Sequence, residues 1–318
     1  MEAAQSANAT PALGGVGVGI VAPGGYAPDP VALDRAEQLL CRHGARVRRF
    51  CADEHKHERF GASDAERAAA LHAAATDPQV DVVLALRGGY GATRLLPLLD
   101  LDLLARSGKL FVGHSDFTAL GLALLAKGGC PSFSGPMVCD DFGRAEPSDF
   151  TIDDFLRCLR GPEHAVSFSG RDLPALDLRG TFWGGNLAML THLVGTPYLP
   201  QVDGGILFVE DINEHPYRIE RMLLQLHHAG VLQRQQALVL GDFSGYRLSE
   251  YDNGYDFDAM LRYIRAVAGI PVLTGLPFGH IRDKVTLPVG AQAHVTTDPG
   301  AARIVFSGYP CLNLRIQT

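Results

Sequence analysis

The sequence has few cysteines, and they stand in no recognisable pattern. The 318 residues contain six cysteines without a Cys-x-x-Cys pair, which argues against a disulfide framework or a zinc site and favours reduced thiols. No apolar run reaches the ~18 residues that span a bilayer. The first residues also lack the basic and apolar regions of a signal peptide. We therefore expect a cytoplasmic protein with a flexible segment over residues 1–14.

The sequence also lacks blocks of basic residues. Its 28 lysines and arginines are outnumbered by 35 aspartates and glutamates, which gives a net charge of −7. Nucleic-acid binding is therefore not expected. The hydrophobic share of 47% and the charged share of 20% are typical of a globular protein, and the length indicates about two domains.

The first half of the chain contains a regular alternation of strand and helix signals. Apolar runs that predict strands alternate with patterns that predict helices, in the order 16–22 (strand), 31–41 (helix), 45–50 (strand), 63–75 (helix), 80–86 (strand), 92–99 (helix) and 109–112 (strand). Ser63 and Glu66 fit a capping box at the start of the second helix. Buried strands separated by helices predict a parallel sheet with helices on both faces.

The pattern changes after about residue 135. Two further helical patterns are mixed with shorter strand signals and turns, in the order 151–159 (helix), 165–169, 180–183 and 205–210 (strands), 216–229 (helix), 237–240 (strand) and 284–306 (β-rich). A mixture of this kind is typical of an α+β unit. We divide the chain into an α/β domain (15–145), a linker region (146–175) and a β-rich C-terminal domain (176–318).

Ser115 stands at a sharp change of pattern. The apolar run of the fourth predicted strand ends at Gly113, and an amphipathic helical stretch begins at Phe117. A serine at such a strand-to-helix turn projects its hydroxyl from the sheet beside backbone N–H groups, as the nucleophiles of hydrolases do. Serine is also a favoured helix cap, so this turn alone leaves both roles open.

A glycine-rich turn follows the third predicted strand, at residues 86–94. Ligands bind at that edge of open α/β sheets, and glycines let the backbone approach them closely. Arg94 stands where a dinucleotide fingerprint needs its third glycine, and no phosphate-loop lysine follows, so neither nucleotide motif is matched. A tight turn without a ligand is the alternative.

Two later segments end in residues that could act on a serine. The buried-type strand 206–211 ends with Glu210 and Asp211, and His280 follows a turn of glycine and proline. Ser115, Glu210 and His280 form a possible triad, in which the histidine accepts the serine proton and the acid orients the histidine. A solvated strand-end acid and a structural loop histidine are the alternatives. The other histidines match no metal-binding spacing, so no metal is expected.

The chain resembles the LD-carboxypeptidases (muramoyltetrapeptide carboxypeptidases), a family of serine peptidases that also contains the microcin C self-immunity peptidases. The similar segments follow the family's order: 19–23 (Gly-Ile-Val-Ala-Pro), 87–91 (Arg-Gly-Gly-Tyr-Gly), 113–116 (Gly-His-Ser-Asp), 134–137 (Ser-Gly-Pro-Met), 184–187 (Gly-Gly-Asn-Leu), 207–211 (Leu-Phe-Val-Glu-Asp), 279–280 (Gly-His) and 287–290 (Leu-Pro-Val-Gly). Relatives often have a tyrosine or another residue where this chain has His114, a departure that we expect to be harmless.

The resemblance implies roles for the residues of the possible triad. Ser115 would be the nucleophile, His280 the general base and Glu210 the orienting acid. Glu214 is the main rival for the acid role, with Asp211 behind it. We prefer Glu210 because it closes the strand and therefore has a fixed position.

The same resemblance implies an oxyanion hole and a site for the substrate's terminal carboxylate. The backbone N–H of Asp116 and one from Gly88 or Gly89 would bind the oxyanion. The carboxylate needs a cation or a helix N-terminus. Arg87 and Arg94 are the candidate cations, and each could equally form a structural ion pair.

The implied activity is release of the terminal D-alanine from the L,D-peptide bond of murein tetrapeptides, small peptides of cytoplasmic cell-wall recycling. Tyr90 and Trp183 could line the cleft, with core packing as the alternative for Trp183. The family fold is a flavodoxin-like α/β domain followed by a β-rich domain, in homodimers without a cofactor or metal. Two other functions stay open: an amidase that detoxifies a peptidyl-nucleotide antibiotic of the microcin C type, and a non-catalytic nucleotide-binding α/β protein.

Overall fold

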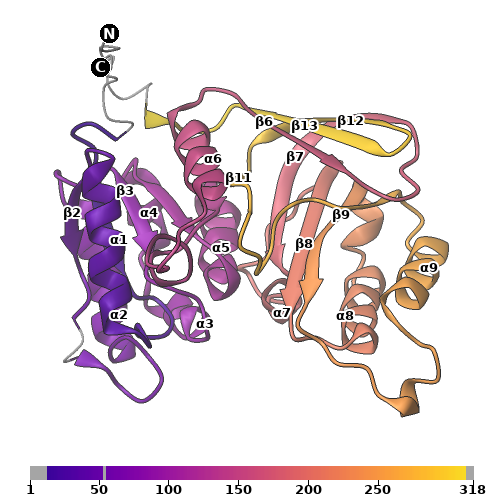
Figure 1. Ribbon diagram of the computed structural model, residues 1–318, viewed down its shortest axis with the longest axis horizontal. Helices are drawn as coiled ribbons and strands as arrows, with labels where there is room; N and C mark the ends of the chain where they lie inside the picture. The colour runs from indigo at the N-terminus through magenta and orange to yellow at the C-terminus, as the bar shows by residue number, and fades with distance from the viewer. Residues whose placement is uncertain (1–12, 53–54, 313–318) are drawn as a thin grey trace, which may run out of the picture.

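The computed structural model describes residues 13–52 and 55–312, which form two β-sheets with helices around them (Figure 1). The predicted flexible segment, residues 1–14, lies outside these ranges except for its last two residues. Among the described residues, no helix is both long and apolar enough to cross a membrane.

The N-terminal sheet contains five parallel strands. These strands are β1 (Gly17–Val21), β2 (Arg46–Arg49), β3 (Val82–Ala85), β4 (Leu110–Gly113) and β5 (Ser132–Ser134). Their spatial order is β5-β4-β3-β1-β2, which is the order of flavodoxin-like folds. The structure therefore confirms the predicted parallel α/β sheet.

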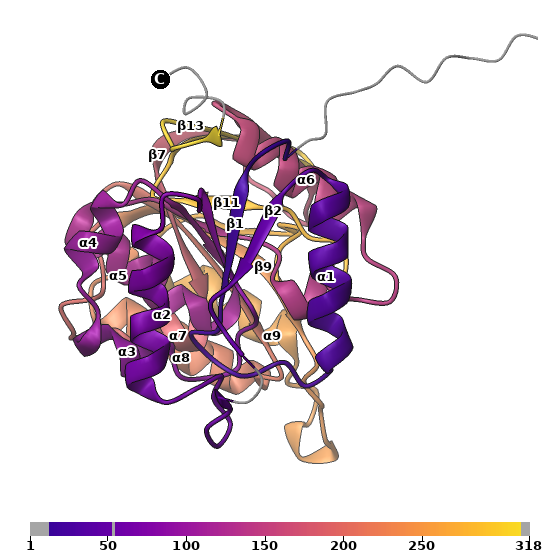
Figure 2. The same cartoon turned by 90° about the vertical axis from the view of Figure 1, so that its left-hand side faces the viewer.

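Helices cover both faces of this sheet. They are α1 (Pro30–Arg42), α2 (Asp64–Thr76), α3 (Ala92–Leu95), α4 (Leu101–Arg106), α5 (Thr118–Gly128) and α6 (Asp149–Arg160). Figure 2 shows β1 and β2 between α1 on one side and α2 on the other. The capping box predicted for α2 is present, because the Ser63 side chain accepts the Glu66 N–H and the Glu66 carboxylate accepts the Ser63 N–H.

A sixth strand of the N-terminal sheet comes from far along the chain. β11 (Leu287–Val289) pairs antiparallel with β5 and forms an edge of the sheet. The sequence predicts β-structure over 284–306 but gives no sign that its first strand joins the other sheet. This strand returns the chain to the N-terminal half shortly after His280.

The C-terminal sheet has seven strands and a mixed topology. They are β6 (His164–Ser169), β7 (Leu176–Asn186), β8 (Gly205–Ile212), β9 (Gln235–Ser244), β10 (Val272–Thr274), β12 (Gln292–Asp298) and β13 (Ala301–Ser307). The run β10-β9-β8-β7 is parallel, and β7-β12-β13-β6 is antiparallel. This β-rich sheet agrees with the fold class expected from the sequence.

The helices of the C-terminal half pack beside the parallel strands. They are α7 (Leu187–His192), α8 (Pro216–His228) and α9 (Phe257–Val267), and Figure 1 shows α8 and α9 next to each other beside β8 and β9. Asp256 caps α9 by accepting the Ala259 N–H at 2.8 Å. We did not predict α7 or α9.

Helix α5 joins the two halves. Its first seven residues, 118–124, are all buried, and it contacts α4 and β5 on the N-terminal side and α7 and β7 on the C-terminal side. A helix that is apolar all round belongs between two packed surfaces. Because Ser115 begins the short turn that leads into this helix, the nucleophile turn lies at the junction of the two halves.

Candidate active site

Ser115 lies in a strained turn between β4 and α5. Its φ of 62° puts it in the left-handed region, which residues other than glycine rarely occupy and which clusters at functional sites. A short 3₁₀ turn, Ser115–Phe117, leads into α5. Gly113 is needed before it, because a Cβ there would overlap the ring of Phe117. The serine is half-buried, so the turn has the form of a nucleophile elbow.

The glycine-rich turn packs directly against Ser115. A Cβ added at Gly88 would lie 2.8 Å from Ser115 Cβ and 2.9 Å from its Oγ. The Gly88 carbonyl accepts the Gly25 N–H at 3.0 Å. Because the carbonyl and N–H of one peptide point in opposite directions, the Gly89 N–H faces away from Gly25. No backbone carbonyl of the described residues accepts that N–H.

The carboxylate of Asp116 fixes the glycine-rich turn. Its Oδ2 accepts the Ala92 N–H at 2.9 Å, and burial raises the pKa of Asp116. The resemblance assigns a role only to the backbone N–H of Asp116. Its side chain thus has a separate, structural task, which holds the segment with Gly88 and Gly89 beside the serine.

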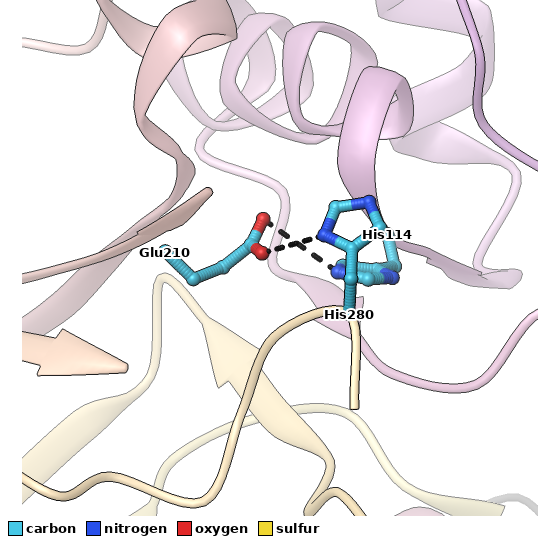
Figure 3. A group of neighbouring side chains, drawn as sticks. All are labelled: His114, Glu210 and His280. Carbon is cyan, nitrogen blue, oxygen red and sulfur yellow. Dashed lines mark hydrogen bonds and ion pairs between the residues drawn. The ribbon is translucent and has the colours of Figure 1, made fainter. Parts of the chain in front are cut away.

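Glu210 and His280 form a hydrogen-bonded pair. Glu210 is fully buried at the end of β8, and its Oε2 lies 2.9 Å from Nδ1 of His280 (Figure 3). Its other oxygen accepts Nδ2 of Asn186 at 3.2 Å. Burial alone would raise the pKa of Glu210, but its interactions with His114 and His280 outweigh burial and hold the pKa well below its usual range. Glu210 is therefore ionised.

The two rival acids have other partners. Glu214 lies 3.3 Å from the guanidinium of Arg218, an ion pair between the residues before α8 and its first turn. Asp211 accepts the Ala188 N–H at 2.9 Å and Nδ2 of Asn186 at 3.0 Å. Burial and the nearby charge of Glu210 raise the pKa of Asp211 to about 6.

His114 forms a cluster with Glu210 and His280. We did not predict that His114 lies there. Only 2% of its side chain is exposed, and its Nε2 lies 3.6 Å from Oε1 of Glu210. Its ring centroid is 4.3 Å from that of His280. Figure 3 shows both rings facing the Glu210 carboxylate. The resemblance indicates that relatives differ at this position. The sequence does not indicate that His114 contacts Glu210, which lies 96 positions away in the chain.

A second contact ties the nucleophile turn to the C-terminal half. Thr118 Oγ1 accepts the Asn186 N–H at 3.0 Å, and Gly185 has no side chain that would collide with Thr118. Within the described ranges, however, no hydrogen bond joins the Ser115 hydroxyl to His280. Catalytic contacts of this kind often tighten only when substrate binds.

The two candidate arginines differ in their surroundings. Arg94 pairs with Asp64, whose Oδ2 accepts its Nε at 2.8 Å, and its guanidinium lies 4.7 Å from the Phe60 ring centroid. Arg87 has no carboxylate of the described chain within 4.0 Å, and its buried Nε has no hydrogen-bond partner there. Among the described residues, the guanidinium makes one hydrogen bond, a long one of 3.5 Å from Nη1 to the Tyr26 carbonyl. Arg87 therefore keeps the capacity to bind an anion.

The two aromatic candidates also differ. Tyr90, in the glycine-rich turn, is 42% exposed, so its ring is accessible to a ligand. Trp183 is 1% exposed, and its indole N–H donates to Gln235 at 2.8 Å. Trp183 packs in the core of the C-terminal half, so we leave it out of the proposed substrate contacts.

The histidine cluster also has the composition of a metal site. Ligand atoms of His114, Glu210 and His280 lie within 4.8 Å of one another. Metal-bound histidines almost always donate their second N–H to an acceptor, and Nδ1 of His114 has none among the described residues. Nδ1 of His280 is already engaged by Glu210. The cluster fits a hydrogen-bonded Glu210–His280 pair better than a metal centre, and the absence of a catalytic metal stays a prediction.

Comparison with family models matches both halves of the chain. Residues 18–135 match the LD-carboxypeptidase N-terminal domain, and residues 179–295 match the LD-carboxypeptidase C-terminal domain. Together the two matches cover more than half of the chain.

Individual relatives and solved structures agree with these matches. A Bacillus subtilis protein named "probable murein peptide carboxypeptidase" is 32% identical over 283 residues, 88% of each chain. The crystal structure of muramoyltetrapeptide carboxypeptidase from Oxalobacter formigenes is 54% identical and has a TM-score of 0.89, covering 93% of this chain and 100% of that one. The microcin C7 self-immunity protein of Escherichia coli is 27% identical, covering 73% of this chain and 76% of that one.

Proposed function

The chain belongs to the LD-carboxypeptidase family, and from this premise we propose that it is a serine carboxypeptidase that releases the terminal D-alanine of murein tetrapeptides. The observation that carries the proposal is the 2.9 Å hydrogen bond between Glu210 and His280, formed beside the strained turn of Ser115. An ionised acid that orients a histidine next to an activated serine is the arrangement of a serine hydrolase.

Acyl transfer to Ser115 is the first step of the proposed reaction. Glu210 accepts the Nδ1–H of His280, which leaves the lone pair on Nε2 to take the serine proton. The serine oxygen then attacks the carbonyl carbon of the third residue. The tetrahedral intermediate collapses as His280 protonates the departing amine of D-alanine, and water later hydrolyses the ester by the same route.

We assign the oxyanion hole to the backbone N–H groups of Asp116 and Gly89. The close packing of Gly88 on Ser115 supports this assignment, as does the lack of a backbone acceptor for the Gly89 N–H among the described residues. Donors fixed before the reaction stabilise the developing charge without reorganising. Asp116 supports both donors, because its carboxylate anchors the glycine-rich turn at Ala92.

We assign the substrate's terminal carboxylate to Arg87. A guanidinium can bind a carboxylate through two parallel hydrogen bonds, and Arg87 has no such partner in the described chain. Arg94 is occupied by Asp64. Tyr90 is exposed beside Arg87 in the same turn and can contact the substrate backbone.

The test is a comparison of matched peptides. The purified chain is incubated with a murein tetrapeptide that ends in D-alanine and with the same peptide ending in L-alanine, and released alanine is measured. We expect release of D-alanine only. Equal cleavage of the two peptides, or no release from either, would contradict the proposed specificity.

A peptidyl-nucleotide substrate tests the alternative amidase function. The relationship to the Escherichia coli self-immunity protein is the observation that keeps this function open. The only tryptophan of the chain is buried and so offers no stacking surface for a base. We therefore expect slower cleavage of an aminoacyl sulfamoyl adenosine than of the tetrapeptide, and the opposite order would favour the amidase.

We also propose that the protein is a cytoplasmic homodimer without a cofactor, as the family resemblance implies. Light scattering at several protein concentrations measures the assembly, and cell fractionation measures the location. A stable monomer that retains full activity would contradict the proposed dimer.

A further inference from the structure

His114 is a buried histidine to which the proposed reaction assigns no task. It comes from the N-terminal half, directly before Ser115, whereas Glu210 and His280 come from the C-terminal half. Its Nε2 lies 3.6 Å from Oε1 of Glu210, and its ring centroid lies 4.3 Å from that of His280. It is therefore in contact with both the acid and the base while belonging to the nucleophile's own turn (Figure 3).

The surroundings of His114 determine its protonation state. Burial lowers the pKa of His114, so at pH 7 and above the imidazole is neutral and carries a single N–H. An ionised carboxylate can only accept hydrogen bonds, so a hydrogen bond between His114 and Glu210 requires the hydrogen on Nε2, the nitrogen that lies 3.6 Å from the carboxylate. This geometry selects the Nε2–H tautomer and leaves a lone pair on Nδ1.

We propose that His114 is a positioning residue for the triad, which donates its Nε2–H to Glu210 and packs its ring against His280. The inference rests on the proposed serine peptidase function. Asn186 already donates to Oε1 of Glu210 and His280 pairs with Oε2, while Nε2 of His114, at 3.6 Å from Oε1 and without a hydrogen-bond partner among the described residues, needs to approach by only a few tenths of an ångström to add a further donor. A carboxylate held from both sides cannot rotate away from the histidine that it orients.

A neutral donor suits this place better than a cation. His280 becomes positively charged when it takes the serine proton, and a second positive charge 4.3 Å away would oppose that step. His114 stabilises the Glu210 carboxylate without such a charge. The ring of Phe278 meets His114 edge-on at 5.2 Å and fixes the plane in which its N–H points.

Other charged groups face the same junction. Asp211 follows Glu210 on β8, and Lys284 is buried in an ion pair of 2.8 Å with Asp141. Asp211, Lys284 and Asp141 are unchanged in the variants compared below. Differences between those variants therefore report on position 114.

The proposed hydrogen bond from His114 affects how the reactivity of Ser115 depends on pH. Without it, the Glu210 carboxylate has one donor fewer and becomes more basic, so the Glu210–His280 pair takes up its proton at a higher pH. The acid limb is the pH range in which Ser115 loses reactivity as the pH falls. Its midpoint should then rise by about one pH unit, the shift that loss of one hydrogen bond to a charged group produces.

Two variants separate the hydrogen bond from packing. His114→Phe keeps an aromatic ring but has no donor, whereas His114→Gln keeps an amide donor and loses the ring. The measurement is the rate of covalent labelling of Ser115 by a fluorophosphonate between pH 5 and pH 9. This reagent needs the nucleophile and the base but no murein substrate. We expect the Phe variant to raise the midpoint of the acid limb by about one unit and the Gln variant to keep it within about 0.3 units.

Two results would overturn the positioning role. One is a midpoint of the acid limb in His114→Phe that equals the wild-type value. The other is an equal shift of that midpoint in both variants, which would indicate that His114 acts through packing alone. Nitrogen-15 NMR of histidine-labelled wild-type protein gives a test that needs no variant to fold. We expect a neutral Nε2–H tautomer of His114 at pH 8, and an Nδ1–H tautomer or a protonated ring at that pH would contradict the proposal.

A His280→Ala control distinguishes this proposal from the one on which it rests. If wild-type and His280→Ala label at the same rate, the triad itself is wrong, and the role of His114 is overturned with it. If His280→Ala is unreactive and His114→Phe keeps the wild-type profile, the triad stands and only the positioning role of His114 is wrong.

Discussion

Oε2 of Glu210 lies 2.9 Å from Nδ1 of His280, although the two residues are 70 positions apart in the chain. The parallel strands β8, β9 and β10 bring them together, because Glu210 lies near the end of β8 and His280 lies in the loop after β10. The acid is fully buried and the histidine keeps one face toward Ser115's half of the molecule, through its contact with His114. This pair determines which acid can serve the proposed triad.

Glu210→Gln should lower kcat by about 10³–10⁴, the range found when the acid of a serine triad is replaced or neutralised. The glutamine retains the shape of the side chain but cannot stabilise the imidazolium that forms on His280. The measurement is steady-state release of D-alanine. Glu214→Gln is the matched control and should stay within about twofold, because Glu214 pairs with Arg218. A large loss in the control with little loss in Glu210→Gln would reverse the assignment.

Gly88→Ala should abolish most activity while leaving the fold intact. The added methyl group would lie 2.8 Å from Ser115 Cβ and 2.9 Å from its Oγ, so it would displace the nucleophile or the oxyanion donors. We expect a loss of at least about 10² in kcat, the effect of removing one oxyanion donor. Circular dichroism checks the fold, and a normally active Gly88→Ala enzyme would show that the turn does not border the reacting atoms.

Arg87→Met should raise KM for a free tetrapeptide by about tenfold or more, the cost of losing a charge-assisted hydrogen bond. The informative comparison is a tetrapeptide whose terminal carboxylate is an amide. For that peptide, wild type and Arg87→Met should have similar KM values, because the partner of the arginine is gone. Arg94→Met is the control and should leave both KM values unchanged. Equal effects of the Arg87 variant on both peptides would contradict carboxylate binding.

Asp211 should make the protein less stable as the pH rises. Burial, followed by the charge of Glu210, raises its pKa to about 6 in the folded chain, so between about pH 4 and pH 6 the folded state holds a proton that the unfolded state has lost. The stability that this proton contributes is present below pH 4 and is lost as the pH passes 6. Across that window, the free energy of unfolding of wild type should fall by up to about 3 kcal/mol relative to Asp211→Asn. Urea titrations measure it, and a constant difference would contradict the raised pKa.

Much of the N-terminal half could be predicted because its signals are local. The capping box at Ser63 and Glu66 appears as predicted. The strand of residues 80–86 and the turn after it were also placed correctly, because an apolar run followed by glycines has few other solutions. The position of Ser115 at a strand-to-helix turn followed from the same kind of evidence.

The missed features depend on contacts between distant parts of the chain. The pairing of β11 with β5 joins residues about 150 positions apart in the chain, and no local pattern specifies it. We expect His114 to be harmless from the sequence because the residue after Ser115, not the one before it, supplies the oxyanion N–H. The contact of His114 with Glu210 arises when α5 packs between the two halves. The burial of Trp183 likewise follows from the packing of β7 in the core, not from its neighbours in the sequence.

The central claim is that Ser115 is the nucleophile of a peptidase that releases D-alanine, and one comparison tests it most directly. D-alanine release from a murein tetrapeptide is measured for wild type, Ser115→Ala and Ser107→Ala. Ser107 serves as the control because its hydroxyl makes local contacts, donating to the Leu104 carbonyl and accepting the Lys109 N–H. We predict a loss of about 10⁴ or more in Ser115→Ala and wild-type turnover in Ser107→Ala. A Ser115→Ala enzyme that releases D-alanine at the wild-type rate would contradict the account.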